Sequence, residues 1–149
     1  MPASGLRLRE RALKALGRRE HTRQELRVKL GEFAESVEQL DSLLDDLERR
    51  GWLSEARFVE QLTLRRRSRF GAARILHEMR EKGVSEAGVE AAQPRLRNSE
   101  AQAARAVWQK KFGNPPASLQ EKAKQARFLA GRGFSPEAVN AVLKSLREK

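Results

Sequence analysis

The stretch GWLSEARF, residues 51–58, carries the signals that decide how this chain folds. Gly51 stands where one helix would end and Ser54 where the next would begin, and the apolar Phe58 follows one turn later. Glycine after a helix and serine at an N-cap both satisfy backbone groups that the helix leaves unpaired. The stretch therefore predicts two helices joined by a tight turn.

The same arrangement occurs twice more along the chain. GVSEAGV at 83–89 and GFSPEAV at 133–139 repeat the glycine, the serine and the apolar residue four positions further on. The spacing between successive glycines is unequal, and helix–glycine–helix turns also resemble one another by chance. If the repeat is real, it predicts helical units that stack along the chain as an elongated array.

Helix signals extend from one end of the sequence to the other. Apolar residues follow a 3.6-residue period, and no alternating strand pattern occurs. The patterning predicts an all-α fold of about nine helices in three tandem three-helix units, at 1–50, 51–97 and 98–149. The expected helices lie near 6–16, 22–30, 36–50, 54–70, 72–82, 85–93, 98–112, 118–130 and 135–147. Expected N-cap residues are Thr22, Ser36, Ser99 and Ser118, and expected C-cap glycines are Gly17, Gly31, Gly51, Gly83 and Gly113.

The composition limits the possible functions. The chain has 149 residues, no cysteine and a net charge of +11. Disulfides and cysteine-based chemistry are therefore excluded, and a polyanionic partner is expected. The N-terminus becomes charged before an apolar stretch could form, and no apolar run could cross a membrane. These features predict a cytoplasmic protein without a secretory signal.

The charge is unevenly distributed. The first fifty residues carry 11 bases and 10 acids, and the segment EFAESVEQLDSLLDDLE at 32–48 holds seven acids and no base. DNA alone would not require an acidic helix in a basic protein. The segment therefore suggests a contact with another protein.

The most basic segment is LTLRRRSRFGAAR at 62–74. On a helix that continues to residue 70, Arg65 and Arg69 would extend the face that carries Phe58. The segment between Glu60 and Glu78 contains no acid, so internal ion pairs were not expected. Because guanidinium groups bind phosphate or carboxylate in a bidentate manner, the run predicts a binding surface. The predicted binding residues here are Arg57, Arg65, Arg66, Arg67, Arg69 and Arg74.

A second basic set lies near the C-terminus and comprises Lys110, Lys111, Lys122, Lys124 and Arg127. These side chains are equally consistent with tracking phosphates and with keeping the chain soluble. Among the aromatic residues only Phe70 lies among arginines in a way that suits base stacking. The others considered, Trp52 and Trp108 among them, are predicted to belong to the core.

No residue pattern in the sequence indicates a catalytic site or a metal site. HEMRE at 77–81 resembles a zincin helix for two residues, but Glu81 occupies the position of the second histidine. The acids Asp41, Asp45 and Asp46 fit a regular acidic helix face better than a metal site. The chain is therefore predicted to have no cofactor, no metal and no enzymatic activity.

Three segments resemble the RecX family of bacterial recombination regulators. They are RREHTRQELRVKL at 18–30, the long block from Leu43 to Ser85 and FLAGRGFSPEAVNAVL at 128–143. The middle block carries the specific pattern, an ordered series of R-G-aromatic-L, R-F, the arginine run, F-G and a K-G turn. The resemblance covers nearly the whole chain, and it implies a curved array of three-helix units.

The resemblance also implies a function. Members of the family bind the RecA recombinase in the groove of its DNA filament, and they inhibit its strand exchange, ATP hydrolysis and coprotease activity. Of the matching positions, Arg65 and Arg67 are the candidates for contact, whereas Gly51, Trp52, Phe58, Gly71 and Gly83 look structural. The expected partners are the RecA filament and, secondarily, single- and double-stranded DNA, with the protein itself monomeric. A stand-alone basic DNA-binding protein is the alternative.

Overall fold

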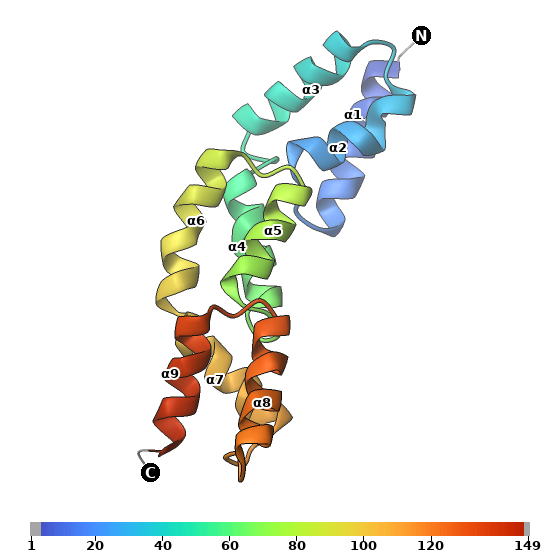
Figure 1. Cartoon of the computed structure of the whole chain (residues 1–149). Helices are drawn as coiled ribbons and strands as arrows, with labels where there is room; N and C mark the ends of the chain where they lie inside the picture. Colours follow the sequence, from blue (N-terminus) through green and yellow to red (C-terminus); the bar gives the residue numbers. More distant parts are fainter. Residues whose placement is uncertain (1–3, 148–149) are drawn as a thin grey trace. The chain divides into compact units, whose positions relative to one another are not determined.

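The computed structural model describes residues 4–147, and the prediction of an all-α protein is confirmed over this range (Figure 1). Its helices are α1 (Ser4–Arg18), α2 (Arg23–Leu30), α3 (Val37–Arg49), α4 (Glu55–Arg66), α5 (Ala72–Glu81), α6 (Glu86–Asn98), α7 (Glu100–Lys111), α8 (Leu119–Gly131) and α9 (Pro136–Arg147), with a 3-10 turn η1 (Gly31–Phe33) after α2. We refer to α1–α3, α4–α6 and α7–α9 as the first, second and third triple.

The chain forms two compact units. The N-terminal compact unit consists of residues 1–61 and 80–88, and the C-terminal compact unit consists of residues 62–79 and 89–149. The second triple is therefore shared, because parts of α4, α5 and α6 belong to each unit.

Each compact unit has its own apolar core. In the N-terminal unit, the leucine stripe of α3 packs with α1 and α2 around the fully buried Leu26 and Leu44. In the C-terminal unit, α7, α8 and α9 lie alongside one another around Trp108 and Leu129 (Figure 1). The indole Nε1 of Trp108 donates a hydrogen bond of 2.8 Å to Gln125, so the polar atom of this core residue is satisfied.

The structure corrects several expected helix ends. Helix α4 ends at Arg66 and not near residue 70, so Arg67 and Arg69 lie in the turn that follows. Helix α6 was expected to end at residue 93, yet it continues through Pro94 to Asn98. A proline removes one backbone donor, and buried apolar residues before and after it (Ala92 and Leu96) hold both sides of the helix in place.

The predicted caps were partly correct. Thr22, Ser36 and Ser118 each accept a hydrogen bond from the backbone three residues on, but Ser99 makes no cap hydrogen bond. The hydroxyl of Ser99 instead donates to the carbonyl of Arg95, because α6 and α7 follow each other almost directly. One of the expected C-cap glycines is wrong, since Gly17 lies inside α1. Gly31 is the C-cap of α2, as predicted, although its backbone is right-handed. The left-handed turn glycines are Gly51, Gly83, Gly113 and Gly133.

Successive triples meet at two equivalent joints, one in each compact unit. In the N-terminal unit, the hydroxyl of Thr22, the N-cap of α2, donates to the carbonyl of Lys82 at 2.5 Å. Lys82 immediately precedes the turn glycine Gly83. A Cβ added to Gly83 would lie 2.5 Å from the side chain of Gln24, so the two segments are in close contact.

The C-terminal unit repeats this joint with other atoms. The amide of Gly71, just before α5, donates to the carbonyl of Arg132 at 2.8 Å. Arg132 again precedes a turn glycine, Gly133, and a Cβ on Gly133 would lie 2.6 Å from that of Arg74. In both joints, residues at the start of the second helix of one triple contact the turn between the second and third helices of the next triple.

The residue before the first joint is a buried histidine. His21 is 2% exposed, its Nδ1 lies 3.0 Å from the carbonyl of Arg19, and its buried Nε2 has no hydrogen-bond partner among the described residues. Burial lowers the pKa of His21, and the positive charges of Arg19 and Lys29 act in the same direction. The hydrogen bond to the Arg19 carbonyl and the charge of Glu25 oppose this shift without reversing it.

The buried histidine predicts a loss of stability in mild acid. Because its folded-state pKa lies below the ordinary 6.5, the unfolded chain binds the proton more readily. The free energy of unfolding should therefore be constant above pH 7 and fall as the pH drops from 6.5 through the folded pKa. Urea titrations between pH 5 and 8 would measure this, and His21→Asn should remove the slope whereas His77→Gln, an exposed control, should keep it. An unchanged slope in His21→Asn would contradict the assignment.

Candidate nucleic-acid interface

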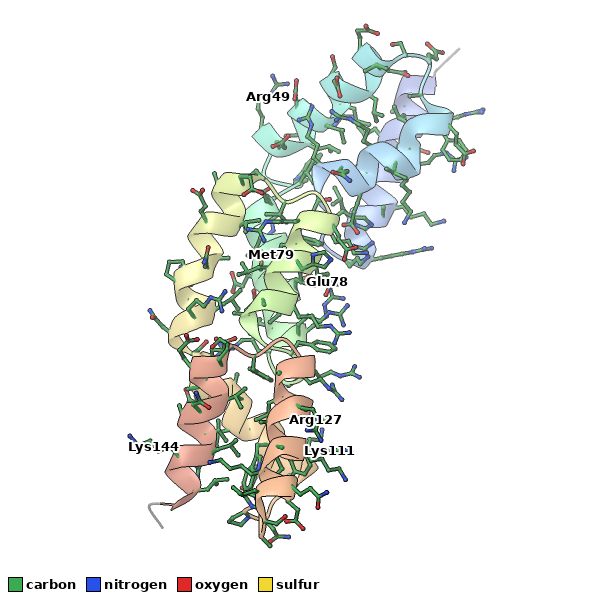
Figure 2. All side chains as sticks on the ribbon, viewed as in Figure 1. Arg49, Glu78, Met79, Lys111, Arg127 and Lys144 are labelled. Carbon is green, nitrogen blue, oxygen red and sulfur yellow. The ribbon has the colours of Figure 1, made fainter. Side chains whose placement is uncertain are left out.

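The two compact units use their charged residues differently. In the N-terminal unit, the acids of α3 are paired with arginines of the same unit. Asp46 accepts from Arg9 at 2.7 Å and from Arg50 at 2.9 Å, and these hydrogen bonds, with one from Arg49, hold the pKa of Asp46 well below its usual range. In Figure 2 the labelled side chain of Arg49 extends away from α3, near the C-terminal end of this helix.

The rest of the acidic helix is neutralised from α2. Arg23 contacts both Asp45 and Glu48, and Arg27 binds Asp41 at 2.7 Å. These carboxylates are therefore paired within the protein, and the expected contact of the acidic segment with another protein stays a prediction. Their role in the structure is to hold α2 and α3 together.

The arginine run divides into paired and unpaired side chains. Arg66 forms a bidentate ion pair with Glu78 of α5, at 2.9 and 3.0 Å, which raises the pKa of the Arg66 guanidinium. The expectation that no acid reaches this run is thus wrong for Arg66. In contrast, Arg65 and Arg67 are exposed, and no carboxylate of the described residues lies within ion-pair distance of either.

Arg57 is also engaged within the protein. Its guanidinium donates to Glu20 at 2.9 Å and to the carbonyl of Gly51 at 2.6 Å, both in the N-terminal unit. These contacts connect the start of α4 to the segment before α2. A binding role for Arg57 would require these hydrogen bonds to be exchanged, so Arg57, like Arg66, is already engaged within the protein.

Phe70 lies at the centre of three guanidinium groups. Arg74 lies 4.2 Å from the centroid of the Phe70 ring, Arg132 lies 5.5 Å away and Arg69 lies 5.7 Å away. Cation–π contacts of this kind orient the arginines, but they neutralise no charge. No carboxylate of the described residues pairs with any of the three. Three positive charges around one ring repel one another, and an anion bound among them would offset this repulsion.

The second basic set continues from this cluster through Phe128. Arg132 also lies 5.0 Å from the Phe128 ring, and Lys111 of α7 lies 5.3 Å from the same ring. Phe112 packs against Phe128 edge to face, which fixes the ring between α7 and α8. We refer to Arg69, Phe70, Arg74, Lys111, Phe128 and Arg132 as the arginine–aromatic cluster.

The remaining predicted lysines surround this cluster unevenly. Lys124 lies one turn before Phe128 on α8 and is exposed, whereas Lys122 is half-buried. Figure 2 shows Lys111 and Arg127 on the same edge of the third triple, with Lys144 of α9 on the opposite edge. The structure thus places Lys111 in the cluster and Lys124 and Arg127 on the same edge of the third triple, and it adds Arg132, which the sequence did not indicate.

The aromatic prediction needs one correction. Trp52 was expected in the core but is 44% exposed, with Arg50 above its ring at 5.3 Å. Phe58, Trp108 and Phe134 are buried as predicted. Phe70 is half-buried and has the Arg74 guanidinium 4.2 Å from its ring centroid, and its suitability for base stacking stays a prediction.

Two carboxylates that the sequence reasoning missed hold the helices beneath this surface. Glu100 at the start of α7 is 4% exposed, and it accepts hydrogen bonds from the amides of Ala72 and Ser135 and from the Ser135 hydroxyl. Glu55 at the start of α4 binds the amide and hydroxyl of Ser85 in the same way. Each is therefore a clamp between the first and third helices of one triple, and Glu100 also holds the start of α5 in the preceding triple. The Ser-Glu dipeptide, repeated at 54–55 and 99–100, is the signal that could have revealed them.

Two features are absent from the part of the chain that the structure describes. No group of three or more histidine or acidic side chains could hold a metal ion. None of the helices in residues 4–147 is long and apolar enough to cross a membrane.

Comparison with known proteins gives a consistent result. The sequence model of the second three-helix domain of RecX matches residues 54–92, and that of the third three-helix domain matches residues 98–143. The "Regulatory protein RecX" of Ralstonia pickettii (strain 12J) is 45% identical over 143 residues, covering 96% of this chain and 90% of the relative. That of Leptothrix cholodnii is 46% identical over 139 residues, covering 93% and 88%.

Solved structures of the same name share the fold. The crystal structure of RecX from Lactobacillus salivarius superposes with a TM-score of 0.85, covering 98% of each chain at 15% identity. A second crystal structure of a regulatory protein RecX gives a TM-score of 0.77, covering 95% of this chain and 73% of the other at 20% identity. The sequence matches carry the assignment, and the folds agree with it: the chain belongs to the RecX family of regulatory proteins.

Proposed function

We propose that this chain is a non-enzymatic regulator that binds the filament of the RecA recombinase on DNA and inhibits its recombinase, ATPase and coprotease activities. Membership of the RecX family supports this proposal. The observation on which it rests most is the set of unpaired guanidinium groups in the C-terminal compact unit, namely Arg65, Arg67 and the arginines around Phe70.

The physical basis is the unsatisfied charge. Exposed arginines that pair with carboxylates gain little from a further anion, but arginines without a partner can donate two parallel hydrogen bonds to a phosphate. The cluster therefore suits DNA phosphates exposed within a nucleoprotein filament. Binding through such contacts releases counterions, so the affinity should fall as salt is raised.

Charge reversal at two of these positions tests the proposal. We expect Arg65→Glu with Arg67→Glu to weaken binding to RecA filaments on single-stranded DNA by at least about tenfold, or ~1.4 kcal/mol. Both side chains are exposed and make no hydrogen bond or ion pair with the described residues, so the helical circular dichroism spectrum should not change. Fluorescence anisotropy of labelled filaments and the RecA ATPase rate would measure the effect.

The matched control is Arg95→Glu with Lys144→Glu. It changes the net charge by the same amount in the same compact unit, and both residues are exposed. Lys144 lies on the edge of the third triple opposite Lys111 and Arg127 (Figure 2). Equal weakening by the two double variants would contradict a localised interface and indicate a general effect of net charge.

A stand-alone DNA-binding protein remains the second candidate, because the same cations would bind naked DNA. It predicts tight binding without RecA, with log affinity falling by about 0.9 per phosphate contact for each log unit of salt. Reversal of Asp45 cannot separate the two candidates, since Asp45 pairs with Arg23 and its loss would disturb the contact between α2 and α3. The ratio of filament affinity to naked-DNA affinity in one buffer separates them directly.

A further inference from the structure

The N-terminal compact unit has a second surface with unpaired cations, away from the acidic helix. A hollow of about 200 Å³ lies between α1 and the end of α2 with η1. Its lining contains no acid, and consists of Arg11, Lys14, Ala15, Arg18, Lys29, Leu30 and Phe33. The four α1 residues follow one face of the helix, so they form one side of a groove.

The four cations of this hollow have no carboxylate partner among the described residues. This contrasts with Arg9, Arg23 and Arg27 of the same unit, whose guanidinium groups are bound to the acids of α3. The charges of the first fifty residues nearly cancel in sum, but the ion pairs named here lie against α3. Around the hollow the positive charge is left uncompensated.

The floor of the hollow is apolar. Phe33 is 40% exposed, although the residues beside it in the lining, Leu30 and Ala15, are buried in the core. The guanidinium of Arg11 lies 3.7 Å from the centroid of the Phe33 ring, a cation–π contact that holds the two side chains together. A surface that only tracks phosphates needs no apolar floor, whereas a surface that receives a bulky apolar side chain does.

We infer that this hollow binds an acidic peptide segment of a partner protein that carries a bulky apolar anchor. The apolar side chain enters between α1 and Phe33, and the flanking carboxylates meet Lys14, Arg18 and Lys29. This is the arrangement by which a short peptide docks into a groove, with an anchor in the hollow and charges at the rim. The inference does not rest on the proposed function, because the hollow and the arginine–aromatic cluster belong to different compact units.

Titration of the isotope-labelled full chain with three probes tests the inference. The probes are a synthetic peptide with a central phenylalanine flanked by glutamates, the same peptide with serine at the centre, and oligothymidylate. The phenylalanine peptide should shift the amide resonances of residues 11–18 and 29–33. The serine peptide should bind at least about tenfold more weakly, since it buries no apolar side chain.

Charge reversal gives the second arm of this test. Lys14→Glu with Lys29→Glu should lower the affinity for the phenylalanine peptide about tenfold, because two exposed ion pairs with the peptide are replaced by repulsion. Arg95→Glu with Lys144→Glu changes the net charge equally in the other compact unit and should alter the affinity less than twofold. Phe33→Ser provides an independent variant if the double reversal disturbs the helical spectrum.

Three outcomes would overturn the inference. The phenylalanine peptide could leave the amides of 11–18 and 29–33 unshifted. The serine peptide could bind as well as the phenylalanine peptide, which would show that the apolar floor contributes nothing. Oligothymidylate could shift the same amides with at least equal affinity, which would assign the hollow to nucleic acid.

Discussion

Glu100→Ala is expected to lower the free energy of unfolding by about 3–5 kcal/mol, which is the usual cost of removing one partner from a buried charged network. The carboxylate lies 3.0 Å from the amide of Ala72, 3.2 Å from that of Ser135 and 2.8 Å from the Ser135 hydroxyl. Arg97 also approaches it at 3.6 Å. Alanine would leave the amide donors at the starts of α5 and α9 without an acceptor. Urea denaturation followed by circular dichroism would measure the loss.

Two further variants separate burial from hydrogen bonding. Glu100→Gln retains one oxygen that can accept from both amides, so its loss should be smaller, about 1–2 kcal/mol. Glu55→Ala removes the equivalent clamp in the second triple, but Ser85 is exposed and water can replace the carboxylate there. Its cost should be about 1 kcal/mol. If Glu55→Ala and Glu100→Ala lowered the free energy of unfolding equally, burial of the Glu100 carboxylate would not explain its contribution to stability.

Gly71→Ala is expected to cost about 3 kcal/mol, at the upper end of the range for overpacking. A Cβ on Gly71 would lie 2.4 Å from both the carbonyl carbon and oxygen of Gly133, and 2.5 Å from the amide nitrogen of Phe134. These are backbone atoms, so relief requires the two segments to separate. The hydrogen bond from the Gly71 amide to Arg132 would then lengthen or break, and the arginine–aromatic cluster would lose its alignment.

Gly131→Ala is the matched control for this effect. It lies at the end of α8 in the same compact unit, and nothing lies within 4 Å of an added Cβ. Alanine in a helix is favoured over glycine, so the variant should be unchanged or more stable by up to about 1 kcal/mol. Hydrogen exchange of the Gly71 amide gives a local readout. If this amide remains protected in Gly71→Ala, the joint does not open as we expect.

The sequence predicted those features that depend on neighbours along the chain. The all-α class and the left-handed glycines at 51, 83 and 133 follow from local signals, since helix periodicity and capping act over a few residues. The concentration of guanidinium groups at 65–74 was visible for the same reason. In the structure neither Arg65 nor Arg67 has an ion-pair partner among the described residues, which is a condition for the predicted binding surface.

The features that the sequence concealed depend on distant partners. Arg66 pairs with Glu78 only because the turn after α4 folds α5 back beside it. The acidic segment looked unpaired because Arg23 and Arg27 lie on a different helix. Arg132 joins the Phe70 ring from a position far along the chain. Periodicity cannot reveal such pairs, since they are set by the packing of one helix on another.

The two clamps and the two joints suggest how such a chain can change in length during evolution. Each glutamate clamp joins the first and third helices of its own triple, and Glu100 also binds the start of α5 in the triple before it. Each joint itself needs only an N-cap group, a carbonyl and a turn glycine. A duplicated gene segment that encodes one triple would bring all of these parts with it. Insertion of such a copy would require no newly invented contact, so this architecture is a natural substrate for tandem duplication and for the design of longer variants.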